Sequence, residues 1–204
     1  LNQLKLREVI NAEFHNQLNE DFIEKILSRK PKLVWIETPS NPLLRITDIV
    51  KITAAAHQVG TVVVVDNTFL SPALQQPLNL GADIVIHSTT KYINGHSDVV
   101  GGAVIAKSQE HFEYLKYWAN CLGLTASPFD SYLTLRGLRT LKARLAVHLA
   151  NTKSIVNVLN AHQAVQKIYY PGLKDHPGHA IALTQQSDFG AMISFELSDT
   201  DEVK

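Results

Sequence analysis

The chain reads Val62-Val-Val-Val-Asp66 and, further on, Asp83-Ile-Val-Ile-His-Ser-Thr-Thr-Lys91. Each run is short, rich in β-branched residues and bounded by turn formers, which is typical of a buried parallel strand. Ligands of open α/β sheets bind at the carboxyl ends of such strands. We therefore expect an α/β fold with a ligand site where these two runs end.

The polar residues at the ends of these runs suit the cofactor pyridoxal phosphate. The amine of Lys91 can react with an aldehyde once it loses its proton, which burial or a nearby cation favours. The carboxylate of Asp66 supplies a negative charge for a protonated pyridine nitrogen. Ser88 and Thr90 are two residues apart, so in an extended segment both hydroxyls face one side and can reach a phosphate ester. Plainer interpretations remain open on spacing alone, because a lysine after a strand is often a solvated charge and an acid there is often a helix cap.

Four longer segments of the chain resemble parts of a known protein family. They are Glu37-Thr-Pro-Ser-Asn-Pro-Leu-Leu-Arg-Ile-Thr-Asp48, Val65-Asp-Asn-Thr-Phe-Leu-Ser-Pro-Ala-Leu-Gln-Gln-Pro77, His87-Ser-Thr-Thr-Lys-Tyr-Ile-Asn-Gly-His-Ser-Asp98 and Phe129-Asp-Ser-Tyr-Leu-Thr-Leu-Arg-Gly-Leu-Arg-Thr-Leu141. Together they resemble the Cys/Met-metabolism family of pyridoxal-phosphate (PLP)-dependent enzymes, from about residue 32 to residue 204. The resemblance implies a fold-type I PLP-dependent transferase with a mostly parallel sheet flanked by helices. Residues 1–149 would form part of the large PLP-binding domain, and residues 150–204 the start of a smaller C-terminal α/β domain.

The resemblance also implies a role for each of five residues. Lys91 matches the catalytic lysine that holds the cofactor and moves protons between the substrate's α carbon, its β carbon and the cofactor. Asp66 matches the acid paired with the pyridine nitrogen, and Ser88 and Thr90 match the hydroxyls that hold the phosphate. Asn41 matches an asparagine beside the cofactor's phenolate oxygen. A turn asparagine before a proline is the alternative interpretation of Asn41.

Within this family, three segments resemble the branch that joins cysteine to an O-acylated homoserine by γ-replacement to give cystathionine. They are Asn41-Pro-Leu-Leu-Arg-Ile-Thr-Asp48, Leu70-Ser-Pro-Ala-Leu-Gln-Gln-Pro77 and Trp118-Ala-Asn-Cys-Leu-Gly-Leu-Thr-Ala126. Cystathionine or methionine γ-lyases, β-lyases and homocysteine-forming sulfhydrylases share the same cofactor frame and remain alternatives. The resemblance further implies small amino-acid substrates, a homotetramer built as a dimer of dimers, and a cytoplasmic location.

Several parts that the family normally supplies have no match here. Residues 1–31 contain neither the glycine-containing phosphate loop nor the aromatic ring that stacks on the cofactor, and no arginine before Lys204 matches the one that grips the substrate carboxylate. The chain also opens on Leu1 and ends on a polar stretch from Ser198. We therefore expect it to be the middle of a longer enzyme. A non-catalytic scaffold fragment is the alternative from another functional class.

Composition agrees with a small-molecule enzyme. The 204 residues are 45% hydrophobic and 19% charged, enough to bury a substantial core. Lysine plus arginine equal aspartate plus glutamate at 19 each, so no basic excess indicates nucleic acid or an anionic membrane. The single cysteine, Cys121, excludes an intrachain disulfide, fits a reducing cytoplasm and is expected to be a buried small residue. A dinucleotide-binding domain is disfavoured because no Gly-x-Gly-x-x-Gly turn is present.

The pattern of apolar and turn residues predicts alternating helices and strands. Helices are expected over 19–30, 46–59, from Ser71 onward, 109–120 and 131–161, and strands over 32–37, 61–66, 83–87, 99–106, 166–170 and 191–197. The scattered histidines form no recognisable metal-ligand cluster, so we expect no metal site. The arginines Arg136, Arg139 and Arg144 are expected to form a solvated helix face or a subunit contact.

Overall fold

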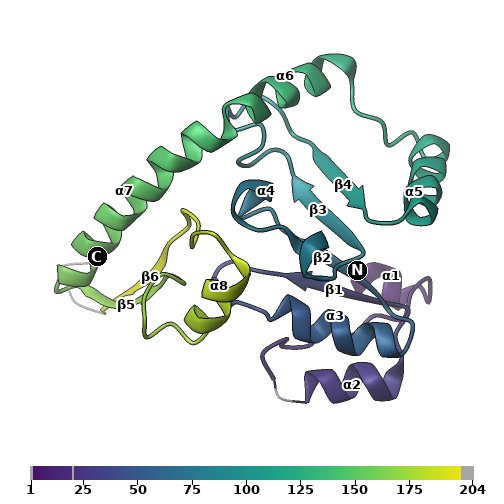
Figure 1. Cartoon of the computed structure of the whole chain (residues 1–204), viewed down its shortest axis with the longest axis horizontal. Coiled ribbons are helices and arrows are strands. Elements are labelled where there is room, and N and C mark those ends of the chain that lie inside the picture. Colours follow the sequence, from purple (N-terminus) through teal and green to yellow (C-terminus); the bar gives the residue numbers. More distant parts are fainter. Residues whose placement is uncertain (1, 20, 199–204) are drawn as a thin grey trace.

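The computed structural model describes residues 2–19 and 21–198, so the last residues of the predicted C-terminal domain lie outside the described part. Its helices and strands follow the order α1 (Asn2–Leu6), α2 (Phe22–Arg29), β1 (Leu33–Glu37), α3 (Ile49–Gln58), β2 (Val62–Asp66), α4 (Ser71–Leu74), the 3-10 turn η1 (Pro77–Leu80), β3 (Ile84–Ser88), β4 (Gly102–Ala106), α5 (Gln109–Cys121), α6 (Pro128–Arg139), α7 (Leu141–Ala161), β5 (Val165–Tyr169), α8 (His179–Gln185) and β6 (Ser194–Leu197) (Figure 1). None of the helices in these two ranges is both long and apolar enough to cross a bilayer.

The main sheet has four strands in the order β1-β2-β3-β4. β1, β2 and β3 run parallel, with Leu33 opposite Val62 and Val64 opposite Ile84. β4 runs antiparallel to β3, with Ile84 opposite Ala106. The predicted mostly parallel sheet is therefore confirmed, and the carboxyl ends of β1, β2 and β3 meet at one edge, where β4 begins.

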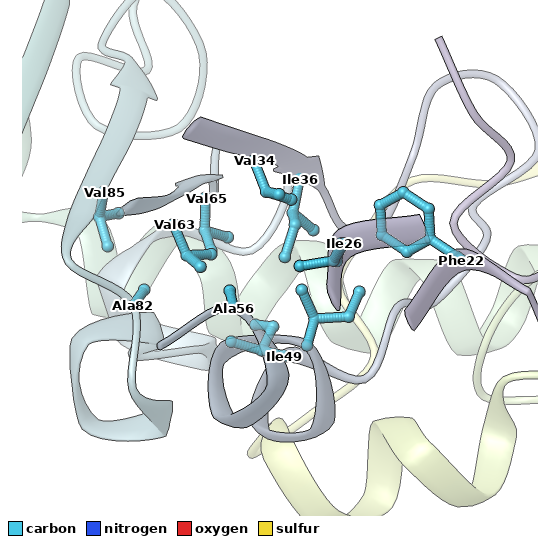
Figure 2. Packing of buried hydrophobic residues seen from close by; sticks show 11 residues of the cluster. Phe22, Ile26, Val34, Ile36, Ile49, Ala56, Val63, Val65, Ala82 and Val85 are labelled. Atoms are coloured by element: carbon cyan, nitrogen blue, oxygen red, sulfur yellow. The ribbon is translucent and has the colours of Figure 1, made fainter. Parts of the chain in front are cut away.

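One face of this sheet packs against α2 and α3 (Figure 2). The buried residues of this core are Phe22, Ile26, Val34, Ile36, Ile49, Ile52, Ala56, Val63, Val65, Ala82 and Val85. The helix α3 begins where the Asp48 carboxylate accepts a hydrogen bond from the Lys51 amide at 2.9 Å. Successive strand residues face opposite sides, so Leu33 and Trp35 project from the other face and are 48% and 52% exposed. Asp66 and Ser88 occupy strand positions that project from that same, more open face.

Two helices follow where a single one was predicted over 131–161. The prediction was wrong in this respect, because α6 ends at Arg139 and α7 begins at Leu141. Thr140, between them, has φ −107° and ψ 3°, and its hydroxyl donates to the Gly137 carbonyl at 3.1 Å. A threonine side chain that satisfies a carbonyl in this way competes with the helix ladder, so the axis breaks there.

The C-terminal part has its own two-stranded antiparallel sheet of β5 and β6. Figure 1 shows the long α7 leading from the main sheet to these strands. Gln185 ties this part back to the first, since its side chain donates to the Thr47 carbonyl at 3.0 Å and accepts from the Ile49 amide at 3.3 Å. The predicted boundary at residue 149 falls inside α7 and stays a prediction.

Cys121 lies in the last turn of α5 and is exposed, so the prediction of a buried residue was wrong. The reason is that α5, within the described residues, buries none of its side chains. A small apolar side chain is buried only where its helix has a packed face.

Candidate active site

Three of the five predicted site residues line one cavity at the strand ends. Asp66 ends β2, Ser88 ends β3, and Asn41 lies in the loop after β1. The cavity measures about 170 Å³. Its lining residues are Glu37, Pro39, Asn41, Asp66, Thr68, Phe69 and Ser88. The sequence prediction that polar groups gather at the carboxyl ends of the parallel strands is therefore seen for these three residues.

Thr90 and Lys91 line a second, larger cavity of about 610 Å³, in the turn that follows Ser88. The Thr90 hydroxyl accepts a hydrogen bond from the Gly101 amide at 3.0 Å, and the Thr89 amide donates to the Gly101 carbonyl at 2.9 Å. The turn therefore closes at its base onto the start of β4. Because Thr90 lies in this turn and not in an extended segment, the expected shared orientation of the two hydroxyls is not observed.

Lys91 is exposed to solvent at the start of this turn. Its amide donates to the Ser88 carbonyl at 3.2 Å, and its own carbonyl accepts from the Gly95 amide at 2.9 Å. Among the residues that the structure describes, no carboxylate lies within ion-pair distance of its ammonium group. The backbone of Lys91 is thus fixed by hydrogen bonds, while its side chain is exposed.

Thr68 is a site residue that sequence reasoning missed. Its amide donates to Asp66 Oδ1 at 3.0 Å, and its hydroxyl accepts from the Ser88 amide at 2.8 Å. Thr68 therefore orients the carboxylate that ends β2 through its backbone amide, and the backbone that ends β3 through its hydroxyl. The available signal was its position two residues after the acid, a spacing at which aspartate side chains accept from the backbone.

Glu37 is the second missed residue. It ends β1 opposite Asp66, and its Oε1 accepts a hydrogen bond from the Asn41 amide at 3.0 Å. This contact orients the loop that carries Asn41. The signal in the sequence was an acid that ends an apolar run, the same pattern that identified Asp66.

A buried pair of amide side chains holds the two loops together. Asn67 and Gln75 are 0% and 1% exposed. Gln75 Nε2 donates to Asn67 Oδ1 at 3.0 Å and to the Thr38 carbonyl at 3.2 Å, while Asn67 Nδ2 donates to the Gln75 carbonyl at 2.8 Å. These contacts connect the segment after β2, which follows Asp66, with the segment after β1, which leads to Asn41.

His87 lies behind this site, on the packed face of β3, and is 3% exposed. Burial lowers the pKa of His87 below its ordinary value of 6.5, while the charge of Asp66 and the backbone of Asn67 act in the opposite direction. Its Nδ1 atom has no hydrogen-bond partner among the described residues. Burial therefore favours the neutral form of the His87 ring, against the opposing influence of Asp66.

The kinds of group that pyridoxal phosphate requires are present in these two cavities. The larger one has a lysine amine and a threonine hydroxyl, and the smaller one has a carboxylate, a serine hydroxyl and an asparagine amide. A metal centre has no such support, since no three His, Cys, Asp or Glu side chains group together within residues 2–19 and 21–198.

Comparison with protein families gives a match over residues 1–204 to the family described as Cys/Met metabolism PLP-dependent enzyme. The chain is 56% identical over 189 residues to the cystathionine γ-synthase of Escherichia coli (strain K12), which covers 93% of this chain and 49% of that protein. It is 48% identical over 186 residues to the cystathionine β-lyase of Lactococcus lactis subsp. cremoris (strain MG1363), covering 91% of this chain and 49% of the lyase.

Solved structures of similar enzymes also match this chain. The cystathionine γ-synthase of Xanthomonas oryzae pv. oryzae, in complex with aminoacrylate and cysteine, superposes with a TM-score of 0.96 at 56% identity over 98% of this chain and 52% of that one. The cystathionine γ-lyase of Lactobacillus plantarum, complexed with L-serine, gives a TM-score of 0.91 at 40% identity over 97% and 53% of the two chains. The chain thus spans about half the length of the relatives it matches.

Proposed function

Because the chain belongs to the Cys/Met metabolism PLP-dependent enzyme family and has its fold-type I architecture, we propose that the whole protein joins cysteine to an O-acylated homoserine by γ-replacement. The product of this reaction is cystathionine. The observation that carries the proposal is the 56% identity to cystathionine γ-synthases in both comparisons, against 48% to a β-lyase and 40% to a γ-lyase.

In this proposal each of the five predicted residues acts on the cofactor or the substrate. Bound pyridoxal phosphate would delocalise into its ring the negative charge that develops on the substrate carbons. Lys91 Nζ holds the cofactor's aldehyde carbon between turnovers, and then removes the proton from the substrate's α carbon and moves protons at the β carbon. The carboxylate of Asp66 keeps the pyridine nitrogen protonated. Ser88 and Thr90 donate hydroxyls to the phosphate, and Asn41 donates its amide to the phenolate oxygen.

The neighbouring contacts support these roles. Asp66 Oδ1 is occupied by the Thr68 amide, which leaves Oδ2 to pair with the pyridinium. The same Thr68 fixes the backbone of Ser88, so the carboxylate and the phosphate-binding hydroxyl keep a constant separation. Groups that are held in place before the substrate arrives need no reorganisation during the reaction.

The remaining expectations are proposals of the same kind. Residues 1–149 would belong to the large PLP-binding domain and residues 150–204 to the start of the C-terminal domain. The family resemblance favours a homotetramer built as a dimer of dimers, working in the cytoplasm on small amino-acid substrates.

The experiment that tests the proposed function uses the whole protein. The purified protein is incubated with pyridoxal phosphate, reduced with borohydride and mapped by peptide mass spectrometry, and we expect the cofactor mass on Lys91. Its activity is then measured with cysteine plus an O-acylated homoserine, and separately with cystathionine alone. Cystathionine formation supports the synthase. If cystathionine is broken down faster than it is formed, the result favours the alternative of a lyase, to which the 48% identity with a β-lyase also points. The absence of any labelled lysine would refute the enzyme and favour a scaffold.

A further inference from the structure

Arg144 lies in the first turn of α7, yet its guanidinium reaches back to the turn that carries Lys91. Nη1 donates to the Tyr92 carbonyl at 2.9 Å, and Nη2 donates to the Ile93 carbonyl at 3.4 Å and to the Gly137 carbonyl at 2.8 Å. The expectation of a solvated helix face was therefore wrong for Arg144, and that of a subunit contact stays a prediction. A guanidinium presents five N–H groups in a rigid plane, so it can bridge several carbonyls at once.

The two residues whose carbonyls it binds come directly after Lys91, in a turn with little freedom. The Asn94 amide donates to the Thr89 carbonyl at 2.8 Å, and the Gly95 amide donates to the Lys91 carbonyl at 2.9 Å. Gly95 has φ +72°, and a Cβ atom built there would lie 2.0 Å from Arg144 Nη1. The guanidinium therefore occupies the space that any side chain at residue 95 would need.

The same stretch of α7 holds this turn from a second side. The rings of Tyr92 and His148 lie 5.8 Å apart at 52°. Tyr92 also packs against a buried cluster to which α7 contributes Leu141 and Leu145, together with Leu70 and Leu74. Polar contacts to the backbone and apolar contacts to the Tyr92 ring thus both come from the first two turns of one helix.

We propose that Arg144 is a positioning residue for Lys91, fixing the carbonyls of Tyr92 and Ile93 so that the lysine enters its cavity from one constant backbone conformation. The inference rests on the proposed role of Lys91. Arg144 also lines the same cavity as Lys91, so the fixed charge and the reactive amine share one space. Removing the guanidinium takes this donor from the carbonyls of Tyr92 and Ile93 and allows the turn to open, while the Gly137 carbonyl keeps the Thr140 hydroxyl.

The test compares Arg144→Met and Arg144→Lys with Arg139→Met, a matched control at an exposed arginine in the last turn of α6. The whole protein is used without cofactor. Hydrogen exchange is followed at the amides of Asn94 and Gly95, and the rate at which a small acylating reagent modifies Lys91 is measured by mass spectrometry across a range of pH.

We expect exchange in the turn to become at least about tenfold faster in Arg144→Met, because hydrogen bonds from a charged donor are lost. The pH profile of Lys91 modification should shift, and the control should match the unmodified protein. Arg144→Lys should recover little of the protection, since one ammonium cannot bridge three carbonyls. Addition of guanidinium ion at a concentration below that needed for unfolding should restore part of the protection in Arg144→Met.

Unchanged exchange and an unchanged Lys91 profile in folded Arg144 variants would overturn the inference. If Arg144→Met does not fold, Arg144→Lys carries the comparison, because it keeps a positive charge and a long side chain but cannot bridge the carbonyls. These readouts need no cofactor, so failure of the unmodified protein to attach pyridoxal phosphate would count against the proposed function alone.

Discussion

Replacement of Gly137 by alanine sets two physical effects against each other. Gly137 is buried in the interior of α6, with no positive φ that would strain an alanine. On helix propensity alone, alanine would stabilise the helix by about 1 kcal/mol. Packing acts in the opposite direction, since a Cβ atom at this position would lie 2.1 Å from the Asn94 carbonyl oxygen and 2.8 Å from that of Ile93.

The packing effect is the larger one. Ordinary contacts between carbon and carbonyl oxygen are about 3.3 Å or longer, so α6 must move by roughly 1 Å from the 93–94 turn. Overpacking of this kind costs about 1–3 kcal/mol. The movement also stretches the bonds of Arg144 to the Gly137 and Ile93 carbonyls, and a hydrogen bond from a charged group is worth about 1.5–3 kcal/mol. With the propensity gain subtracted, Gly137→Ala should destabilise the protein by about 1.5–5 kcal/mol.

The assay is denaturant unfolding of the whole protein, with Arg136→Ala as the control at an exposed position of the same helix. We expect a lower unfolding midpoint for Gly137→Ala and a nearly unchanged one for the control. Faster hydrogen exchange at Asn94 should accompany the loss of stability. Stabilisation by Gly137→Ala, equal to the propensity gain, would refute the packing argument and the close approach of α6 to the turn.

Three further predictions concern the site. Lys91→Ala should abolish cofactor labelling by borohydride without loss of folding, and labelling that survives at another lysine would contradict the assignment. Gln75→Leu should cost roughly 2–6 kcal/mol in unfolding free energy, because two buried acceptors lose their donor at about 1–3 kcal/mol each, whereas Leu at the exposed Gln76 should change it by less than about 0.5 kcal/mol. Burial lowers the folded-state pKa of His87 below 6.5, so the unfolded state binds the proton first and stability should fall as pH drops below about 6.5. His87→Phe should flatten that part of the pH profile of unfolding, and an unchanged slope would show that His87 does not contribute.

The elements that sequence predicted well are those whose signal is local. The runs that end at Asp66 and Ser88 carry their β-branched composition and their terminal polar residues in one short stretch, and both strands form with the expected parallel pairing. Asn41, Asp66 and Ser88 meet because parallel strands deliver their carboxyl ends to one edge, a rule that requires no knowledge of the rest of the chain.

The features that sequence did not predict depend on partners far along the chain. The prediction for Arg144 rests on its own helix alone, whereas the carbonyls of Tyr92 and Ile93 that it binds lie about fifty residues earlier in the chain. The break between α6 and α7 follows from the hydrogen bond that the Thr140 hydroxyl donates to the Gly137 carbonyl. Helix propensity does not predict such a bond. The prediction for Thr90 assumes an extended strand, whereas β3 ends at Ser88 and the chain turns there.

The hydrogen bonds of Thr89 and Thr90 with Gly101 hold both ends of the intervening segment at one point of the sheet. The two ends of this segment therefore stay at a fixed separation, whatever residues lie between them. The entropic cost of closing such a loop rises by only about 0.6 kcal/mol for each doubling of its length. Changes within this segment therefore need not shift the register of β3 against β4. Which changes the segment tolerates is determined instead by its contacts with two other helices, since Arg144 binds the carbonyls of Tyr92 and Ile93 and Gly137 lies against Asn94.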